Sequence, residues 1–160
     1  MKPSFLHQTK VFLSKKTKLF LSKTYPGFYV KNRFKVDLNY IPNFKDPKTH
    51  NERMAKRRFL YTDQMTMLSD KIAVRKYVSE NLGNKYLVPI LFEMDSLNEN
   101  IYNQLPNSFV IKSNHGSGFN LIVRNKLDYS YIQLKKITDK WLKTKYHLLL
   151  MELHYKNIKP

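Results

Sequence analysis

The sequence of 160 residues lacks cysteine altogether and contains few glycines and few acidic residues. Without cysteine it has no disulfide framework, no thiolate zinc site and no cysteine nucleophile. It contains no run of about 18 apolar residues, so no transmembrane helix is encoded. Lys15, Lys16 and Lys18 interrupt the apolar residues near the N-terminus, and we expect no secretory signal there. We therefore expect a cytoplasmic protein, and peripheral association with the inner face of the membrane stays open.

The shortage of acidic residues makes the chain strongly basic. It has 29 Lys and Arg against 12 Asp and Glu, a net charge of +17. Residues 1–60 hold 15 of the basic residues and 3 of the acidic ones, a balance of +12, and residues 61–160 carry the remaining +5. Such a charge attracts nucleic acid, anionic lipid, nucleotide phosphates and acidic polysaccharide, and charge alone does not indicate which of these is the partner.

Apolar residues (42%) and aromatic residues (14%) are plentiful enough to exclude wholesale disorder. Residues 9–22 place two apolar clusters around a Lys-rich middle, which predicts a basic amphipathic helix. A helix of this kind packs on the protein's own core, the interpretation that we favour, or lies on an anionic membrane. Residues 24–50 contain four prolines and glycines that predict an extended, wrapping segment. Residues 51–68 favour a helix.

The next segments carry clearer boundary signals. Ser69 or Asp70 is predicted to cap a helix that runs to about Leu82, where Gly83 suits a left-handed C-terminal cap. Residues 86–92 form a short apolar run typical of a strand, and the proline within it indicates a sheet edge or a bulge.

Residues 108–112 and 120–124 are two more short β-rich runs. Asp128 is then predicted to cap a helix that extends through the apolar residues 148–153. The order of helix, three strands and helix indicates an α+β or α/β fold, and we expect α+β.

The loop between the last two predicted strands concentrates polar chemistry. Residues 113–119 read SNHGSGF and include two of the four glycines in the chain, and Lys112 ends the strand before them. Small residues let backbone N–H groups approach an anion closely, and a lysine at the loop mouth supplies a point charge for a phosphate oxygen. An ordinary hairpin loop with two turn glycines has the same composition, and that alternative stays open on composition alone.

Several segments in a fixed order carry a resemblance to a known family. They are Asp70-Lys71 with its helix, Leu87-Val88-Pro89, Leu105-Pro106, the strand ending at Lys112 with its glycine loop, Trp141-Leu142, Glu152-x-x-Tyr155 and Ile158-x-Pro160. Residues 46–53, DPKTHNER, match a further segment, with His50 and Arg53 as departures from the family pattern. In this order and spacing the sequence resembles the TupA-like ATP-grasp family, found in bacterial cell-surface polysaccharide gene clusters, over about residues 37–160.

The resemblance implies that ATP is held between two α+β subdomains. One basic residue lies on the helix after the Asp-Lys pair, and a second ends a strand before a glycine-rich flap. Because Lys71 and Arg75 are one helical turn apart, we expect them to share a helix face and to converge on one anion. The residues implied for ATP binding are Lys71, Arg75, Lys112, Asn114, His115, Gly116, Ser117 and Gly118.

The resemblance also implies an activity of the ATP-dependent carboxylate–amine ligase type, although such proteins are often described as glycosyltransferases. In the family the acidic Mg²⁺ ligands lie beyond the segment that ends here at Pro160, and the twelve acids of this chain are scattered. We therefore expect an ATP-grasp fold truncated before its second subdomain, with no metal ligands. Its parts are a basic, partly helical segment at residues 1–36 and a partial domain at residues 37–160.

The implied partners are ATP and either an acidic saccharide or an anionic membrane surface. A second copy of the chain, or a separate C-terminal half of the fold, is a further implied partner. The alternative function is a basic module without catalysis that binds nucleic acid or an anionic membrane. The aromatic residues offered for base stacking are Tyr25, Phe28, Tyr29, Phe34 and Tyr40. Because no nucleic-acid-binding motif accompanies them, we disfavour nucleic acid as the partner.

Overall fold

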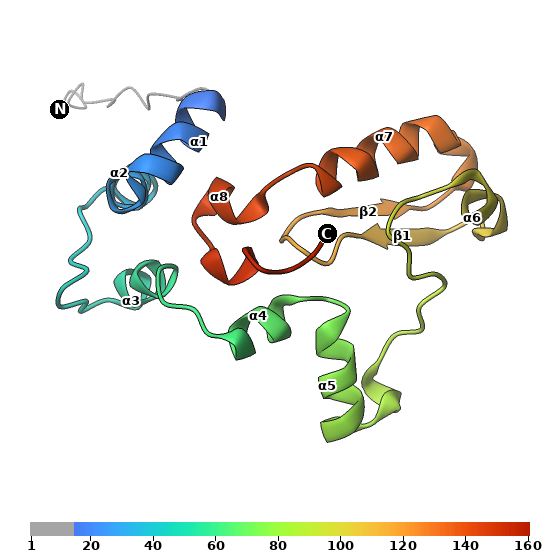
Figure 1. The fold of residues 1–160 in the computed structure, drawn as a ribbon, viewed down its shortest axis with the longest axis horizontal. Coiled ribbons are helices and arrows are strands. Elements are labelled where there is room, and N and C mark those ends of the chain that lie inside the picture. The colour runs from blue at the N-terminus through green and yellow to red at the C-terminus, as the bar shows by residue number, and fades with distance from the viewer. Residues whose placement is uncertain (1–14) are drawn as a thin grey trace, which may run out of the picture. The chain divides into compact units, whose positions relative to one another are not determined.

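A computed structural model describes residues 15–160, which fall into two compact units (Figure 1). The described part of the first unit runs to Phe59 and includes Leu148–Met151, and the second comprises Leu60–His147 and Glu152–Pro160. No helix in this described range is long and apolar enough to cross a membrane. The predicted start of an ATP-grasp-like domain at residue 37 stays a prediction.

The first unit contains the helices α1 (Lys15–Thr24), α2 (Pro26–Leu38) and α3 (His50–Arg57). The helix predicted over residues 9–22 is present from residue 15 onward, and residues 9–14 lie outside the described residues. Helix α1 packs against α2.

The extended segment predicted for residues 24–50 is wrong over its first half, which forms α2. Pro26 occupies the first helical turn, where its missing N–H is not needed and its fixed φ favours the helix. Tyr29, Val30 and Phe34 are buried along one side of α2, and this burial stabilises the helix. Asn39 ends the helix in the left-handed region, at φ 62°.

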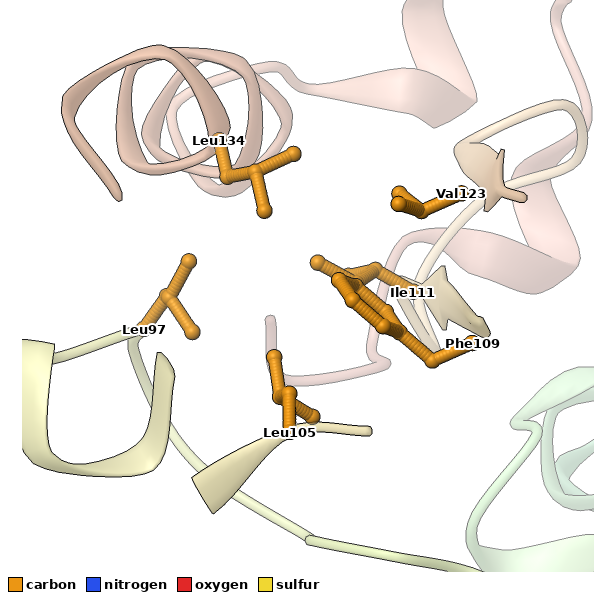
Figure 2. Packing of buried hydrophobic residues seen from close by; sticks show 6 residues of the cluster. All are labelled: Leu97, Leu105, Phe109, Ile111, Val123 and Leu134. Atoms are coloured by element: carbon orange, nitrogen blue, oxygen red, sulfur yellow. The ribbon is translucent and has the colours of Figure 1, made fainter. Parts of the chain in front are cut away.

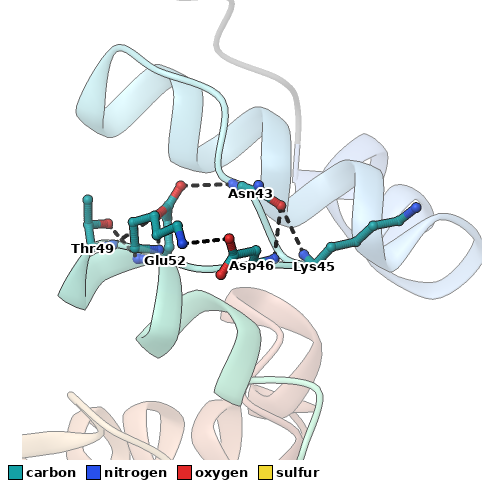
Figure 3. Close-up of polar contacts among 6 residues, drawn as sticks. Asn43, Lys45, Asp46, Thr49 and Glu52 are labelled. Carbon is teal, nitrogen blue, oxygen red and sulfur yellow. Dashed lines mark hydrogen bonds and ion pairs between the residues drawn. The ribbon is translucent and has the colours of Figure 1, made fainter.

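One buried carboxylate organises the irregular chain before α3 (Figure 3). Glu52 accepts backbone N–H bonds from Asn43 at 2.8 Å and from Lys48 and Thr49 at 2.9 Å each. The Thr49 hydroxyl in turn accepts from the Glu52 backbone, which completes a capping box at the start of α3. The N–H of Asn43 most of all, with those of Thr49 and Lys48, lowers the pKa of Glu52 to about 2, against the opposing effect of burial.

The second unit begins with α4 (Asp63–Ser69) and α5 (Ala73–Leu82). The single helix predicted over residues 51–68 is therefore wrong, because the chain breaks after α3 and Thr62 caps a new helix by accepting from the Met65 backbone. The cap predicted at Ser69 or Asp70 is wrong: α5 begins at Ala73 with Ile72 at its N-cap and no side-chain cap, and the Asp70 carboxylate accepts from the Ile72 N–H at 2.9 Å in the turn between α4 and α5. Gly83 follows α5 at φ 95° as expected, although its ψ of 158° lies outside the left-handed helical region.

The strand predicted for residues 86–92 is wrong. A 3₁₀ turn at Asn84–Tyr86 leads into irregular chain, and no other strand of the described residues lies beside it. The Val88 carbonyl instead accepts a hydrogen bond from the Arg75 guanidinium at 2.9 Å. A short apolar run forms a strand only where a neighbouring strand receives its backbone hydrogen bonds.

The two remaining predicted strands are confirmed as β1 (Phe109–Lys112) and β2 (Asn120–Val123). They form an antiparallel hairpin in which Phe109 faces Val123 and Lys112 faces Asn120. Since successive residues point to opposite faces, Phe109 is buried while Lys112 is exposed. The second unit is thus a small antiparallel sheet with helices, and the α+β fold class is confirmed.

Three further helices complete the chain: α6 (Glu99–Gln104), α7 (Tyr131–Leu142) and α8 (Tyr146–Leu150), with 3₁₀ turns at Lys126–Asp128 and Leu153–Tyr155. The cap predicted at Asp128 is wrong by two residues. Ser130 forms a capping box with Gln133 at the start of α7, and a serine followed three residues later by glutamine satisfies two backbone donors at once. The predicted extension through residues 148–153 is also wrong, since α7 ends at Leu142.

The core of the second unit lies between the hairpin and α7 (Figure 2). Its side chains come from the hairpin, from α7 and from both ends of α6, and they point toward one another. They are Leu97, Leu105, Phe109, Ile111, Val123 and Leu134. This core fixes one face of the hairpin and leaves the face that carries Lys112 open.

We predict that Glu52→Gln lowers the thermal unfolding midpoint at neutral pH, because the amide cannot accept three N–H bonds as a carboxylate does. Folding lowers the pKa of Glu52 from 4.5 to about 2, so its contribution is complete above pH 4.5 and is lost as the pH falls toward 2. Unfolding followed by circular dichroism should show the two proteins converging over that pH range. Glu80→Gln, which removes an exposed partner of Lys76, is the control. Equal curves for wild type and Glu52→Gln over the whole range contradict the assignment.

Candidate functional site

The hairpin loop, residues 113–119, is held in a defined conformation. The Ser113 N–H donates to the Phe119 carbonyl at 2.9 Å, which continues the hairpin beyond the ladder of β1 and β2. Gly118 has φ 78°, a region that favours glycine. The loop is therefore a tight turn with a defined conformation at the end of the sheet.

Lys71 lies against this loop. It precedes α5, and its ammonium donates to the Gly116 carbonyl at 2.5 Å. Burial lowers the pKa of Lys71, and the positive charge of Lys112 lowers it further, while Asp70 acts in the opposite direction. The charge of Lys112, which is distant in the sequence, thus acts on Lys71 beside the glycine loop.

Lys112 supplies the second charge. It is exposed on the outer face of β1, opposite Asn120. Within residues 15–160 its ammonium has no hydrogen bond or ion pair with another side chain or carbonyl. The charge of Lys112 lowers the pKa of Lys71, so an anion that contacts both ammonium groups would be stabilised by both.

The side chain of His115 is buried in the interior of the second unit. One ring nitrogen lies 2.5 Å from the Ser113 hydroxyl and the other lies 3.0 Å from the Trp141 carbonyl. Because a carbonyl only accepts, Nε2 carries the proton, and Nδ1 of the neutral ring accepts from Ser113. Burial lowers the pKa of His115, which keeps the ring neutral. The histidine ties the loop to the end of α7.

Gly116 lies where no side chain fits. A Cβ atom added there would lie 2.8 Å from both the Phe119 and the Tyr146 rings. Those two rings meet edge to face at 5.3 Å, and Phe119 also stacks on Trp141 at 6.0 Å. The glycine therefore serves close packing as well as turn geometry, and the loop rests on an aromatic cluster.

The remaining loop residues are tied to the C-terminal segment. The Asn114 amide donates to the Lys159 carbonyl at 2.7 Å. Burial first and the charge of Glu152 next raise the pKa of the Tyr146 phenol to about 12, and the neighbouring Ser117 acts in the opposite direction. The side chains of both loop residues are therefore partly engaged within the protein.

Arg75 is the predicted site residue that the structure does not bring to the loop. Because α5 begins only at Ala73, Lys71 lies outside the helix and the two side chains share no helix face. Lys71 reaches Gly116, whereas Arg75 reaches the Val88 carbonyl. In this structure Lys71, Lys112 and the loop come together, and Arg75 supports the irregular segment after α5.

Sequence reasoning missed the aromatic support of the loop. Tyr146 and Phe119 enclose Gly116, and Tyr155 meets Tyr146 at 4.9 Å. Tyr146 is one of eleven tyrosines and stands in no periodic pattern, so no local signal distinguished it. Over residues 15–160, no three His, Asp or Glu side chains lie together as a metal site would require.

A family model described as TupA-like ATPgrasp matches residues 48–160. The chain belongs to the TupA-like ATP-grasp family. The resemblance seen in the sequence is thereby confirmed, and ATP-grasp proteins in general bind ATP. The matched residues include Lys71, Lys112 and the whole glycine loop. No curated protein and no solved structure matches the chain.

We predict that Gly116→Ala destabilises the second unit by about 1–3 kcal/mol, because the new methyl group overlaps two aromatic rings that are packed on both sides. Urea unfolding followed by Trp141 fluorescence measures the change. Gly27→Ala is the matched control, since a Cβ there meets nothing within 4 Å and α2 gains a better helix former. Equal stability of Gly116→Ala and wild type contradicts the close packing.

We predict that the second unit loses stability as the pH falls below 6.5, the ordinary pKa of histidine. Folding lowers the pKa of His115, so the unfolded chain binds the proton more tightly and acid favours unfolding. His115→Gln should reduce the slope of stability against pH between 7 and 5, and His147, whose pKa is also lowered, retains part of it. His50→Gln, which replaces an exposed histidine at the start of α3 in the first unit, is the control. An unchanged slope in His115→Gln contradicts the tethered neutral ring.

Proposed function

We propose that the second unit binds the phosphate groups of ATP between Lys71 and Lys112, against the backbone of the glycine loop. The observation that carries this proposal is the position of Lys71 at the loop: its ammonium donates to the Gly116 carbonyl at 2.5 Å, and the charge of Lys112 lowers its pKa. A protein retains two repelling cations at a defined turn where an anionic ligand compensates them.

The residues present fit a polyphosphate. Lys112 has no competing partner in the described part of the chain, and the Lys71 ammonium uses one of its three donors on Gly116. Ser117 and Gly118 are the exposed residues of the loop, and ATP brings about four negative charges that two ammonium groups and backbone donors offset in large part.

The other predicted residues act by positioning. Ser113 and His115 hold the base of the loop, Gly116 allows its close packing, and Gly118 supplies the turn. Asn114 and Ser117 link the loop to the C-terminal segment and to Tyr146. We assign Arg75 a supporting role through Val88, and a direct phosphate contact would require it to leave that carbonyl.

The reaction class that we propose is ATP-dependent carboxylate–amine ligation in the biosynthesis of a cell-surface polysaccharide. When bound, ATP supplies the phosphoryl group that activates a carboxylate for attack by an amine. Family membership supports this proposal, and the +12 balance of residues 1–60 favours an acidic saccharide as the second substrate. A nucleotide substrate is consistent with the cytoplasmic location that we propose.

We predict that Lys112→Ala weakens ATP binding by roughly tenfold to a hundredfold, as expected for the loss of one charge-assisted contact. Titration of ATP against Trp141 fluorescence measures it, because Trp141 stacks on Phe119 at the base of the loop. Isothermal titration calorimetry gives an independent affinity.

Lys136→Ala, an exposed lysine of α7, is the matched control because it removes the same charge. It should change the affinity by less than about threefold. Adenosine, which has no phosphate, should bind wild type and Lys112→Ala equally. An equal ATP signal in wild type and Lys112→Ala shows that the phosphate assignment is wrong.

A further inference from the structure

The outward faces of α1 and α2 carry a repeated arrangement that the proposed nucleotide site does not use. Each presents an exposed phenylalanine among lysines: Phe20 is 59% exposed on α1 and Phe28 is 60% exposed on α2. Tyr25, the single residue between the helices, is 61% exposed. Large aromatic side chains this exposed in a monomer are typical of an interaction surface when they gather with a common chemistry around them.

Helical spacing places the lysines beside the phenylalanines. On α1, Lys16 and Lys23 lie four residues before and three residues after Phe20, and all three are exposed. Ser22, on the other side of α1, is buried. Since residues three and four apart are neighbours on a helix, the exposed face of α1 is one phenylalanine flanked by two ammonium groups.

Helix α2 repeats this pattern. Lys31 and Lys35 lie three and seven residues after Phe28 on its exposed face, while the opposite face is buried through Tyr29 and Phe34. Buried Tyr29 donates its hydroxyl proton to the Leu149 carbonyl at 2.8 Å, which anchors that inner face within the first unit. The outward orientation of Phe28 is therefore fixed by packing on the other side of the helix.

Acidic residues are scarce in α1 and α2. Residues 15–38 hold seven Lys and Arg and one acid, Asp37, a net charge of +6. Asp37 forms an ion pair with Arg33 at 3.4 Å and stands nine residues after Phe28. At about 100° per residue, nine residues make about two and a half turns, a net rotation of half a turn, so the Cα of Asp37 lies on the other side of α2 from that of Phe28.

We propose that this face of the first unit, formed by Phe20, Tyr25, Phe28 and their flanking lysines, docks on the surface of an anionic phospholipid bilayer. Aromatic rings enter the headgroup region while ammonium groups on flexible stems stay in contact with lipid phosphates. Neither helix is long enough to span, so the contact is peripheral. The proposal is independent of nucleotide binding by the second unit.

The chemistry favours lipid over nucleic acid. Six of the seven cations are lysines, and the one arginine, Arg33, is engaged by Asp37. Recognition of single-stranded nucleic acid draws on guanidinium groups that stack on bases and on grooves that follow the backbone. Protruding rings between point charges on the outer faces of two helices suit a flat anionic surface better.

The test is sedimentation of the full chain with vesicles of phosphatidylcholine alone or mixed with phosphatidylglycerol. Wild type should pellet with the anionic vesicles only. A charge variant, Lys16→Gln, Lys23→Gln, Lys31→Gln and Lys35→Gln, should lose at least about tenfold in affinity. An aromatic variant, Phe20→Ser, Tyr25→Ser and Phe28→Ser, should show a similar loss that persists at high salt, where the lysines are screened.

Matched controls come from exposed positions in the second unit. Lys76, Lys85, Lys136 and Lys140 changed to Gln remove the same charge, and Tyr86, Val88 and Leu91 changed to Ser remove comparable exposed apolar area. Both controls should keep the wild-type affinity within about twofold. Because all substituted side chains are exposed, far-UV circular dichroism should show every variant folded.

Three outcomes overturn the proposal. A loss in the controls as large as in the α1–α2 variants shows that net charge alone attracts the vesicles. Binding of a single-stranded oligonucleotide without binding of anionic vesicles assigns the surface to nucleic acid. A dimer in solution that the aromatic variant dissociates, again without vesicle binding, assigns it to a second copy of the chain.

Discussion

The close approach of the Gly116 backbone to two aromatic rings is the contact on which the candidate site depends. Because Phe119 and Tyr146 leave no room for a Cβ atom, the loop rests directly on the interior of the second unit. The same residue offers its carbonyl to Lys71, and its neighbour His115 is tied to Ser113 and to the end of α7. The position of one lysine and the shape of the turn are thus fixed by packing beneath the loop rather than by the loop sequence alone.

Charge is used in two different ways in the two units. In the second unit, the Lys71 ammonium donates to the Gly116 carbonyl and its pKa is lowered by burial and then by the charge of Lys112, and this is where we propose that phosphate binds. In the first unit, a single buried carboxylate, Glu52, satisfies three backbone N–H groups and defines the chain before α3. Lys16, Lys23, Lys31 and Lys35 are exposed on α1 and α2, as are the aromatic residues Phe20 and Phe28.

The predictions that succeeded rest on local chemistry. The two strands of the hairpin and the end of α5 before Gly83 each follow from a few adjacent residues. Most of the predictions that failed concern segments whose structure depends on contacts with residues distant in the sequence. Residues 86–92 have strand composition but no neighbouring strand in the described structure, and α2 is helical because its inner side is buried. Asp128 and Ser130 both offered a cap, and the capping box with Gln133 decided for Ser130.

Composition, alternation and motif order are properties of the linear chain, and they were enough to establish the net charge, the α+β class, the hairpin with its glycine loop, and membership of the TupA-like ATP-grasp family. Which cations lie at the loop depends on packing between distant elements. It placed Lys71 on Gly116 and Arg75 on Val88, although the two stand four residues apart. It also turned His115 inward, because a ring with hydrogen-bond partners at both nitrogens is more stable buried and neutral than facing solvent. Spacing along a chain limits which side chains can meet, and packing between distant elements selects among those possibilities.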